Sequence, residues 1–444
     1  MAIYALSSGA DKSGIAVIRI SGTDTRNIVK KLTNREILIP NKVTLTCFYN
    51  PEDNDLIDKG LLLWFKGPNS FTGEDLAELH VHGSKAVIKT FYNILSKFNN
   101  CKLAEPGEFT KLAFLNGKLD LLNVEALSDL ISSETEIQRK QALKILNGDA
   151  SKKYFNIRNK LIKVLSNVEA KIDFPEEDLP EDILIKIKKE VKETILDIKA
   201  ILDDGRIGEK IREGFKISIL GPTNAGKSSL INYLSKREVA IVSEIEGTTR
   251  DLIEVNLNFD GYPVIITDTA GLRKTSDKIE NRGVELALKS AKTADLKIIM
   301  LDAKNPDFST FLDDINDENS ILVFNKSDLI YGSIESDNSY LKKHILISLK
   351  KEINLDKLTN EIKKRLKNKF LIKDNILISR ERHRLNLEKC IHHLNVFLEN
   401  NSINDFDKAA EDLRIATRYL GKVVGDVDVE EVLGKIFSDF CIGK

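Results

Sequence analysis

The chain has 444 residues, of which 42% are hydrophobic and 30% are charged, a composition that excludes a single small domain and wholesale disorder and allows about three domains. Its 67 Lys and Arg residues nearly balance its 68 Asp and Glu residues, and the net charge of -1 excludes a global positive field that would attract nucleic acid. Any RNA partner would therefore be held by a local patch or by a second protein.

Four cysteines are scattered along the chain without a Cys-x-x-Cys pair, which is typical of neither a disulfide framework nor a zinc site. No apolar run approaches the roughly 20 residues that cross a bilayer, and the N-terminus lacks the basic and then apolar pattern of a secretory signal. We therefore expect a cytoplasmic protein without a membrane segment.

The first 118 residues combine strand and helix patterns. Apolar runs at 14–20 and 60–65 are typical of strands, and turn-forming residues at 50–51 and 67–70 separate the elements. This pattern predicts an α+β N-terminal domain over residues 1–118.

Helical periodicity dominates two later stretches. There is no proline between Pro106 and Pro175 or after Pro306, so long helices are allowed in both stretches. Apolar residues three and four positions apart form several stripes. The stripes are Ile157, Leu161, Val164, Val168 and Ile172; Leu184, Ile187, Val191, Ile195, Ile198 and Ile201; Leu387, Ile391, Leu394 and Leu398; Ala409, Leu413, Ala416 and Leu420; and Val429, Val432, Ile436 and Phe440.

Residues 214–366 lie between these stretches and alternate strand and helix patterns, as in a parallel sheet covered by helices. The late helices need an apolar surface to cover, so we expect them to pack on the earlier ones. The prediction is one discontinuous helical domain, 119–213 with 367–444, into which the α/β domain is inserted.

A phosphate-binding loop follows the first strand of the inserted domain. Residues 221–228 read Gly-Pro-Thr-Asn-Ala-Gly-Lys-Ser and match the G-x-x-x-x-G-K-S pattern, between an apolar strand at 216–220 and a helix from Ser229. The glycines let backbone N–H groups surround phosphates, Lys227 can reach the β and γ oxygens, and Ser228 can bind Mg²⁺. The loop predicts a P-loop domain.

Two later segments would complete the site for a guanine nucleotide. Residues 268–271 (Asp-Thr-Ala-Gly) follow a strand, where a carboxylate can hold Mg²⁺ through water and a glycine amide can sense the γ-phosphate. Residues 325–328 (Asn-Lys-Ser-Asp) follow another strand, and Asp328 can accept hydrogen bonds from guanine N1–H and N2–H₂, which adenine lacks. The last base-edge element, 348–350, reads Ser-Leu-Lys in place of the usual Ser-Ala-Lys.

The motifs leave open which group activates water. Leu272 stands where many small GTPases have a glutamine, and leucine cannot orient water. The candidates are Arg273, Glu280, the acidic loop 243–251 acting with a cation, and a partner supplied on assembly. From the residues alone, a solvated carboxylate at a helix start is the favoured interpretation of Glu280.

These motifs, together with segments near both ends of the chain, resemble the MnmE (TrmE) family of bacterial tRNA modification GTPases. The resemblance is carried by residues 67–75, 106–110, 247–251, 268–273 and 440–444 and runs end to end. It implies a Ras-like GTPase domain inserted in a helical domain, stimulated by K⁺, with two such domains meeting across a homodimer.

The resemblance also implies roles for individual positions. Asn224, Ser243, Ile245 and Thr248 would surround K⁺, Ser228 and Thr249 would hold Mg²⁺, and Glu280 would orient the hydrolytic water, with Lys227 as the second catalytic residue. The residues expected around GTP are Asn224, Ala225, Gly226, Lys227, Ser228, Ser229, Ser243, Glu244, Ile245, Glu246, Gly247, Thr248, Thr249, Asp268, Thr269, Ala270, Gly271, Asn325, Lys326, Asp328 and Ser348.

For the N-terminal domain, the resemblance implies dimerisation and binding of 5-formyl- or 5,10-methylene-tetrahydrofolate through Arg19, Glu78, Lys118 and Lys444. The family forms a heterotetramer with MnmG (GidA), which carries FAD. Together they add a carboxymethylaminomethyl or aminomethyl group at C5 of the wobble uridine of certain tRNAs. The competing interpretation is a regulatory, ribosome-associated GTPase that modifies nothing.

Three further features favour ordinary explanations. Glu78, His80 and His82 would share one face of a strand and imitate a metal site, but no other ligand cluster accompanies them. The lysine-rich stretch 186–192 is interpreted as the solvated face of a helix, with tRNA contact as the minority hypothesis. Cys441 is either a small apolar residue or a redox thiol, and the segment that it begins fits a prenylation signal poorly.

Overall fold

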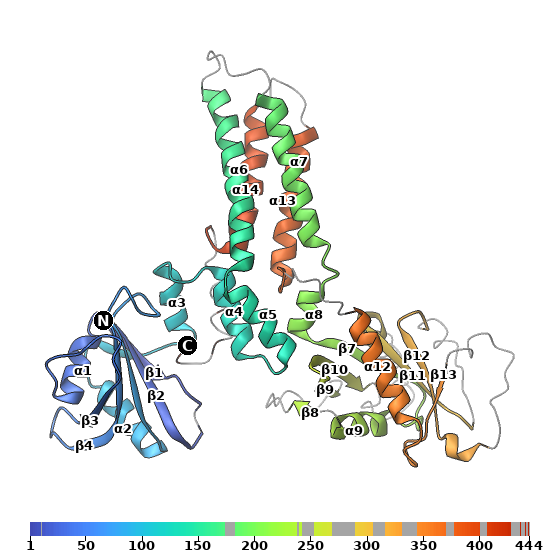
Figure 1. The fold of residues 1–444 in the computed structure, drawn as a ribbon, viewed down its shortest axis with the longest axis horizontal. Helices are drawn as coiled ribbons and strands as arrows, with labels where there is room; N and C mark the ends of the chain where they lie inside the picture. The colour runs from blue at the N-terminus through green and yellow to red at the C-terminus, as the bar shows by residue number, and fades with distance from the viewer. Residues whose placement is uncertain are drawn as a thin grey trace, which may run out of the picture. The chain divides into compact units, whose positions relative to one another are not determined.

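A computed structural model of the chain describes residues 1–9, 11–173, 183–237, 239–241, 253–268, 289–304, 316–330, 344–369, 377–399 and 406–427, together with Ile436, Phe440 and Gly443 (Figure 1). The chain forms two compact units. The first comprises Met1–Ser128, Ile145–Ile195 and Asn386–Lys444, and the second comprises Asp129–Lys144 and Leu196–Leu385. The domain boundaries expected from the sequence, at 118, 213 and 366, remain a prediction.

The first unit begins with a six-stranded sheet and three helices. The strands are β1 (Ala2–Leu6), β2 (Ser13–Gly22), β3 (Thr44–Tyr49), β4 (Leu56–Phe65), β5 (Leu76–Gly83) and β6 (Cys101–Leu103), in the order β3-β4-β5-β2-β1-β6. The helices are α1 (Thr25–Thr33), α2 (Lys85–Leu95) and α3 (Glu108–Leu115). Neighbouring strands run antiparallel, except β1 and β6, which run parallel. The predicted α+β fold is confirmed.

The two faces of this sheet carry different side chains. Along β2, Ile18 and Ile20 are fully buried in the core that α1 and α2 complete. Arg19 lies between them, so the alternation of a strand directs it to the opposite face. It pairs in register with Glu78 of β5 on one side and with Ala5 of β1 on the other. Polar and aromatic side chains are therefore brought together on the face away from α1 and α2.

Helices from before and after the inserted domain pack together in the first unit. Helix α6 (Asp149–Asp173) contacts α14 (Phe406–Val424), although more than 200 residues separate them. The buried stripe of α6 is Tyr154, Ile157, Leu161, Val164 and Val168, and that of α14 includes Leu413, Ala416 and Leu420. Ion pairs of 3.0 Å join Arg158 to Asp426 and Arg414 to Glu169. The predicted discontinuous helical bundle is thus confirmed.

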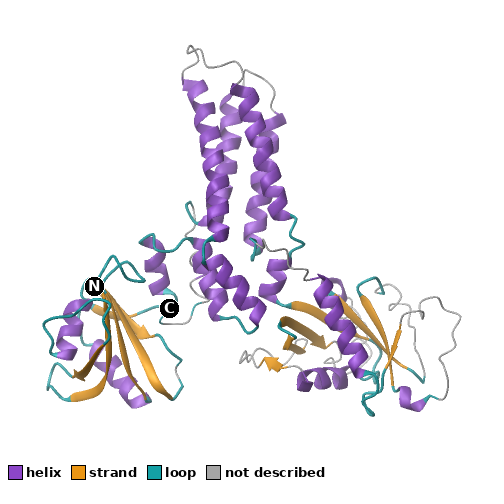
Figure 2. Cartoon of the chain, in the orientation of Figure 1, coloured by secondary structure: helices purple, strands orange, loops and turns teal. Residues whose placement is uncertain are grey.

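Four other helices run through the unit boundary: α4 (Leu121–Ile131), α5 (Glu136–Leu146), α7 (Ile183–Leu202) and α13 (Glu381–Glu399). Figure 2 distinguishes the helices, in purple, from the strands of the two sheets, in orange.

The second unit is built on a seven-stranded sheet. Its strands are β7 (Phe215–Leu220), β8 (Val239–Ile241), β9 (Ile253–Phe259), β10 (Tyr262–Asp268), β11 (Leu296–Asp302), β12 (Ser320–Asn325) and β13 (His344–Leu346), in the order β13-β12-β11-β7-β10-β9-β8. Among the described residues, the helical elements that lie wholly within this unit are α8 (Ile207–Glu213), α9 (Lys227–Arg237), the short 3₁₀ helix η2 (Ser327–Leu329) and α12 (Leu355–Lys369). One core includes Leu230 of α9 and Leu358 of α12, and a second includes Leu301 and Phe324.

The sheet confirms the predicted α/β fold: its five central and edge strands on one side are parallel, and an antiparallel pair that the sequence pattern did not indicate extends the other edge. Strands β10, β7, β11, β12 and β13 run parallel, but β9 pairs antiparallel with both β10 and β8. The reversal is a two-residue hairpin in which Asp260 and Gly261 have φ of 57° and 89°. An Asp-Gly pair is the usual chemistry of a turn that needs positive φ at both positions. The Asp-Gly pair that predicts such a turn was present in the sequence.

A buried ionic cluster ties together the segments that lead into and out of the sheet. The guanidinium of Arg384, whose side chain is 5% exposed, donates to both carboxylate oxygens of Glu209 and to Asp204 at distances from 2.7 to 3.2 Å. Burial alone would lower the pKa of Arg384, but the hydrogen bonds that it donates to Glu209 and Asp204 raise the pKa above its ordinary value. Arg384 is therefore charged at neutral pH and faces the two carboxylates as a cation.

Substitution of Arg384 tests how much this cluster contributes to the stability of the fold. Arg384→Met leaves two buried carboxylates without their cation, so we expect the free energy of unfolding to fall by about 3–5 kcal/mol. Urea denaturation followed by circular dichroism measures the change. The matched control is Arg206→Ala, because Arg206 pairs with Glu381 at the surface, where an ion pair contributes about 0–1 kcal/mol. Equal losses in the two variants would contradict the structural role of Arg384.

Candidate GTP site

The phosphate loop joins β7 to α9, and close backbone contacts explain its two glycines. A Cβ atom at Gly221, where φ is 142°, would lie 2.0 Å from the carbonyl oxygen of Met300. A Cβ at Gly226, where φ is 104°, would lie 2.4 Å from Nδ2 of Asn325. Asn224 adopts the left-handed conformation, with φ of 64°. Only glycine fits at the two ends, so the pattern G-x-x-x-x-G follows from backbone geometry.

Lys227 begins α9 and lies inside the loop. Its ammonium donates to the carbonyl oxygens of Gly221 and Pro222 at 2.7 and 2.8 Å, and the residue is 7% exposed. These bonds hold the loop in its curved form and place a cation where phosphate oxygens would bind. The N-terminus of α9 adds positive potential at the same point.

Asn325, at the end of β12, links the phosphate loop to the base-binding loops. It is 4% exposed; its Nδ2 donates to the carbonyl of Ala225 at 2.9 Å, and its Oδ1 accepts from the backbone N–H of Leu349 at 3.2 Å. The bond to Leu349 uses the backbone, so it is compatible with leucine in place of the usual alanine. One buried amide therefore sets the distance between the phosphate and base subsites.

Asp328 occupies the position expected to read guanine. Its Oδ1 accepts a hydrogen bond of 2.5 Å from the hydroxyl of Ser348. That bond is the main cause of the lowered pKa of the Asp328 carboxyl group. The carboxylate is therefore ionised at neutral pH and can accept both guanine donors, N1–H and N2–H₂.

The structure brings together the predicted residues of three separate segments. They are Asn224, Ala225, Gly226, Lys227, Ser228 and Ser229; Asn325, Lys326 and Asp328; and Ser348. The remaining predicted positions lie outside the described residues: Ser243, Glu244, Ile245, Glu246, Gly247, Thr248, Thr249, Thr269, Ala270, Gly271, Glu280, Cys441 and Lys444. Asp268 ends β10, and its backbone alone is described.

One contact of the site was not predicted. Lys326, which has φ of 65°, places its ammonium 2.5 Å from a carboxylate oxygen of Asp302, the last residue of β11. Asp302 ends an apolar strand and pairs in register with Asn325. A carboxylate at this end of a parallel strand was the sequence signal that could have placed Asp302 in the site. The ion pair orients the base-binding loop.

A second polar cluster lies in the N-terminal part of the first unit. Arg19 donates to Oε1 of Glu78 from Nη2 at 2.7 Å and from Nε at 3.2 Å. The Arg19 guanidinium also lies 5.6 and 5.7 Å from the ring centroids of Phe71 and Phe109. His80 is a further member that the sequence did not single out for this cluster: its Nε2 is buried without a hydrogen bond, 3.5 Å from the other oxygen of Glu78.

Of the other two residues expected to bind folate, Lys118 is described and Lys444 lies outside the described residues. Lys118 is exposed, and no ion pair or side-chain hydrogen bond among the described residues joins it to Arg19 or Glu78. Lys444 follows Gly443, whose carbonyl accepts a 2.8 Å hydrogen bond from Ser7, just after β1. Gly443 is thus held beside the end of β1, the strand that neighbours Arg19.

The metal-site interpretation of Glu78, His80 and His82 finds no support. His82 pairs with Asp58 at 2.8 Å rather than with the other two residues. The part of the chain that the structure describes contains no group of three His, Cys, Asp or Glu side chains arranged to hold a metal ion.

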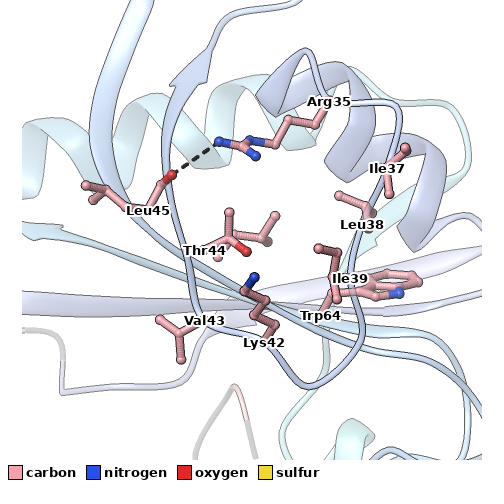
Figure 3. A pocket seen from close by; sticks show the side chains of 10 residues that line it. Arg35, Ile37, Leu38, Ile39, Lys42, Val43, Thr44, Leu45 and Trp64 are labelled. Atoms are coloured by element: carbon pink, nitrogen blue, oxygen red, sulfur yellow. Dashed lines mark hydrogen bonds between the residues drawn. The ribbon is translucent and has the colours of Figure 1, made fainter.

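A cavity of about 270 Å³ lies elsewhere in the first unit, beside the edge strand β3. Figure 3 shows Leu38, Ile39 and Trp64 along one side, with Arg35 donating to the carbonyl of Leu45. None of the residues expected to bind folate lines this cavity. It is therefore distinct from the Arg19–Glu78 cluster.

The geometry defines the class of protein. A phosphate loop between a parallel strand and a helix, joined through Asn325 to a guanine-selective carboxylate, is the site of a P-loop GTPase. Residues 121–441 match the family described as MnmE helical domain, and residues 2–118 match that described as GTP-binding protein TrmE N-terminus. The chain belongs to the MnmE family of tRNA modification GTPases.

Full-length relatives agree with this assignment. The chain is 58% identical to the tRNA modification GTPase MnmE of Pelagibacter ubique (strain HTCC1062), covering 100% of both chains. It is 44% identical to the protein of that name from Rickettsia bellii (strain RML369-C), covering 100% of this chain and 99% of the relative.

Among solved structures, the G domain of the T. maritima FeoB iron transporter aligns with 34% of this chain at 25% identity, covers 98% of its own length and has a TM-score of 0.26. Among the described helices, none is both long and apolar enough to span a bilayer.

Guanine selectivity provides a direct test of the site. In Asp328→Asn, the amide can accept one hydrogen bond and donate another, so it suits xanthine, which has a carbonyl at C2. We expect GTP affinity to fall by at least about 100-fold and affinity for xanthosine triphosphate to rise. Fluorescence titration with labelled nucleotides measures both. The control is Asp356→Asn, whose carboxylate is 75% exposed on α12; unchanged selectivity in Asp328→Asn would contradict the assignment.

Proposed function

We propose that this GTPase adds a carboxymethylaminomethyl or aminomethyl group to C5 of the wobble uridine of certain tRNAs, together with a flavin-dependent MnmG (GidA) partner that carries FAD in a heterotetramer. Two features of one chain support the proposal: the GTP site and the Arg19–Glu78 cluster. The family assignment over the full length supports tRNA as the substrate. We place the protein in the cytoplasm, where tRNA is modified.

The phosphate loop would bind the triphosphate through backbone N–H groups and Lys227. Ser228 lies in the first turn of α9 and, with Thr249, would hold Mg²⁺, which neutralises charge between the β- and γ-phosphates. Lys227 would exchange its bonds to the loop carbonyls for phosphate oxygens. Glu280 would orient the hydrolytic water, because Leu272 cannot.

A potassium ion is the second cation of the proposal. Asn224 is exposed at the tip of the phosphate loop, and no side-chain hydrogen bond within the described residues uses its amide, so its oxygen fits a hard cation. Ser243, Ile245 and Thr248 would complete the site when two G domains meet in the homodimer. The ion would supply positive charge beside the γ-phosphate, where the loop 243–251 contributes acidic residues.

The Arg19–Glu78 cluster would bind a 5-formyl- or 5,10-methylene-tetrahydrofolate, with Lys118 and Lys444 facing its acidic tail. The residues present fit this ligand: Oε1 of Glu78 takes both bonds from Arg19, which leaves Oε2 for a pterin N–H. The unpartnered Nε2 of His80 provides a further polar group, and Phe71 and Phe109 suit a flat ring. A reduced folate supplies a one-carbon unit when bound.

Potassium dependence is tested by the rate of GTP hydrolysis at constant ionic strength. We expect turnover at least about tenfold faster in K⁺ than in Na⁺, because the cation stabilises charge that develops in the transition state. Asn224→Ala should reduce this ratio below about twofold. The control is Asn232→Ala, an exposed asparagine on α9. Equal rates of the wild type in the two cations would remove K⁺ from the proposal.

Folate binding separates the modification enzyme from a regulatory, ribosome-associated GTPase. Isothermal titration of the full chain with 5-formyltetrahydrofolate should show binding. Glu78→Gln should weaken it at least about tenfold, since a charged hydrogen-bond acceptor contributes about 1.5–3 kcal/mol. The control is Glu52→Gln, because Glu52 is 59% exposed. No heat of binding to the wild type would favour the regulatory alternative.

A further inference from the structure

Helix α6 presents a solvent face that carries no carboxylate. Between Asp149 and Glu169 the sequence contains no Asp or Glu. The exposed residues of this interval are Lys152, Lys153, Asn156, Asn159, Lys160, Ile162, Lys163 and Ser166. All but one of these side chains can donate hydrogen bonds to phosphate oxygens, and four of them are cationic. We refer to these eight residues as the lysine face of α6.

The lysine face is held on a rigid support. The opposite side of α6 is buried against the bundle, with Leu161 and Val164 fully buried. The ion pairs of Arg158 with Asp426 and of Glu169 with Arg414 hold the middle and the C-terminal end of the interval to neighbouring segments of the same unit. Glu169, the first carboxylate after the face, is thereby already engaged by a cation.

Three of the four lysines of this face form no ion pair within the described residues: Lys152, Lys153 and Lys163. The lysine-rich stretch of α7 is different, because Glu190 and Glu193 interrupt it. In a chain whose net charge is -1, such local segregation of cations is the feature expected where a neutral protein binds a polyanion.

The spacing suits a phosphate backbone. Lys152 and Lys163 are three helical turns apart, which separates their Cα atoms by about 16 Å along the axis. Asparagine and lysine side chains fill the interval, and the flexible lysine stems can follow phosphates that recur every few ångström along a strand. The face contains no aromatic residue that could stack on a base. It would therefore position RNA without reading its sequence.

We propose that the lysine face of α6 binds the sugar-phosphate backbone of the substrate tRNA. This inference rests on the proposed function, which supplies tRNA as the polyanion, and it adds the surface that holds the RNA while the wobble base is modified elsewhere. An acidic surface of a protein partner is the competing occupant.

The test uses the full chain and fluorescently labelled tRNA. The variant replaces Lys152, Lys153 and Lys163 by glutamine, which preserves helix propensity. The matched control replaces Lys351, Lys357 and Lys364, three exposed lysines of the second unit. Fluorescence anisotropy over a range of KCl concentrations gives the dissociation constant and its salt dependence, and thermal melting shows that each variant is folded.

We expect the α6 variant to bind tRNA at least about tenfold more weakly, and the slope of log K against log salt to shrink by about 2, since each lost phosphate contact removes about 0.7–0.9. The control variant should match the wild type, and replacement of the same three α6 lysines by arginine should retain binding.

Three results would overturn the inference in distinguishable ways. An α6 variant with the affinity and salt slope of the control excludes this face from tRNA binding and leaves the proposed function intact. Normal tRNA binding with loss of the heterotetramer would assign the face to a protein partner. Failure of the wild type to bind tRNA would remove the proposed substrate and this surface together.

Discussion

The approach of the phosphate loop to the end of β11 is the contact on which the rest of the GTP site depends. Gly221 lies so close to the Met300 carbonyl that a side chain would occupy the position of the oxygen. This contact permits the chain to turn sharply after β7, and α9 starts at Lys227, directly after the turn. Anion binding therefore originates in backbone packing at the centre of the sheet, and the charge of Lys227 is added to it.

The same packing couples the two halves of the nucleotide site. Asn325 reaches the carbonyl of Ala225 and also receives the N–H of Leu349, so a shift of the base-binding loops would disturb the phosphate loop. Burial of an amide is inexpensive in free energy when both its N–H and its oxygen are hydrogen-bonded, and loss of either partner is strongly destabilising. Lys326 and Asp302 reinforce the arrangement from the next strand. The site is thus one hydrogen-bonded structure assembled from distant segments.

The sequence predicted those parts of the molecule that depend on local pattern. Apolar spacing located α6 and α7, and the phosphate-loop pattern located β7 and α9 within a residue or two. The antiparallel edge of the second sheet was missed, because alternating strand and helix patterns do not report direction and the Asp260-Gly261 turn was not used. The contact between Asn325 and Ala225 spans 100 residues, and no periodicity encodes such a pairing. The exposure of individual side chains could not be predicted from the sequence either. The sequence drew attention to the lysines of α7, whereas the lysines of α6 are the ones that lie exposed on a face without carboxylates.

The two proposals together give a nearly neutral chain opposite responses to salt. The loop 243–251 is acidic, so a K⁺ ion bound beside it would make the identity of the monovalent ion matter at the GTP site. A polyanion on the lysine face of α6 would be held through screened charges, for which only the total ionic strength counts, whichever cation supplies it. Under the two proposals, a rise in KCl would favour hydrolysis and weaken RNA binding at the same time. Replacement of Na⁺ by K⁺ at fixed ionic strength would separate the two effects, because that exchange changes the first interaction and leaves the second unaltered.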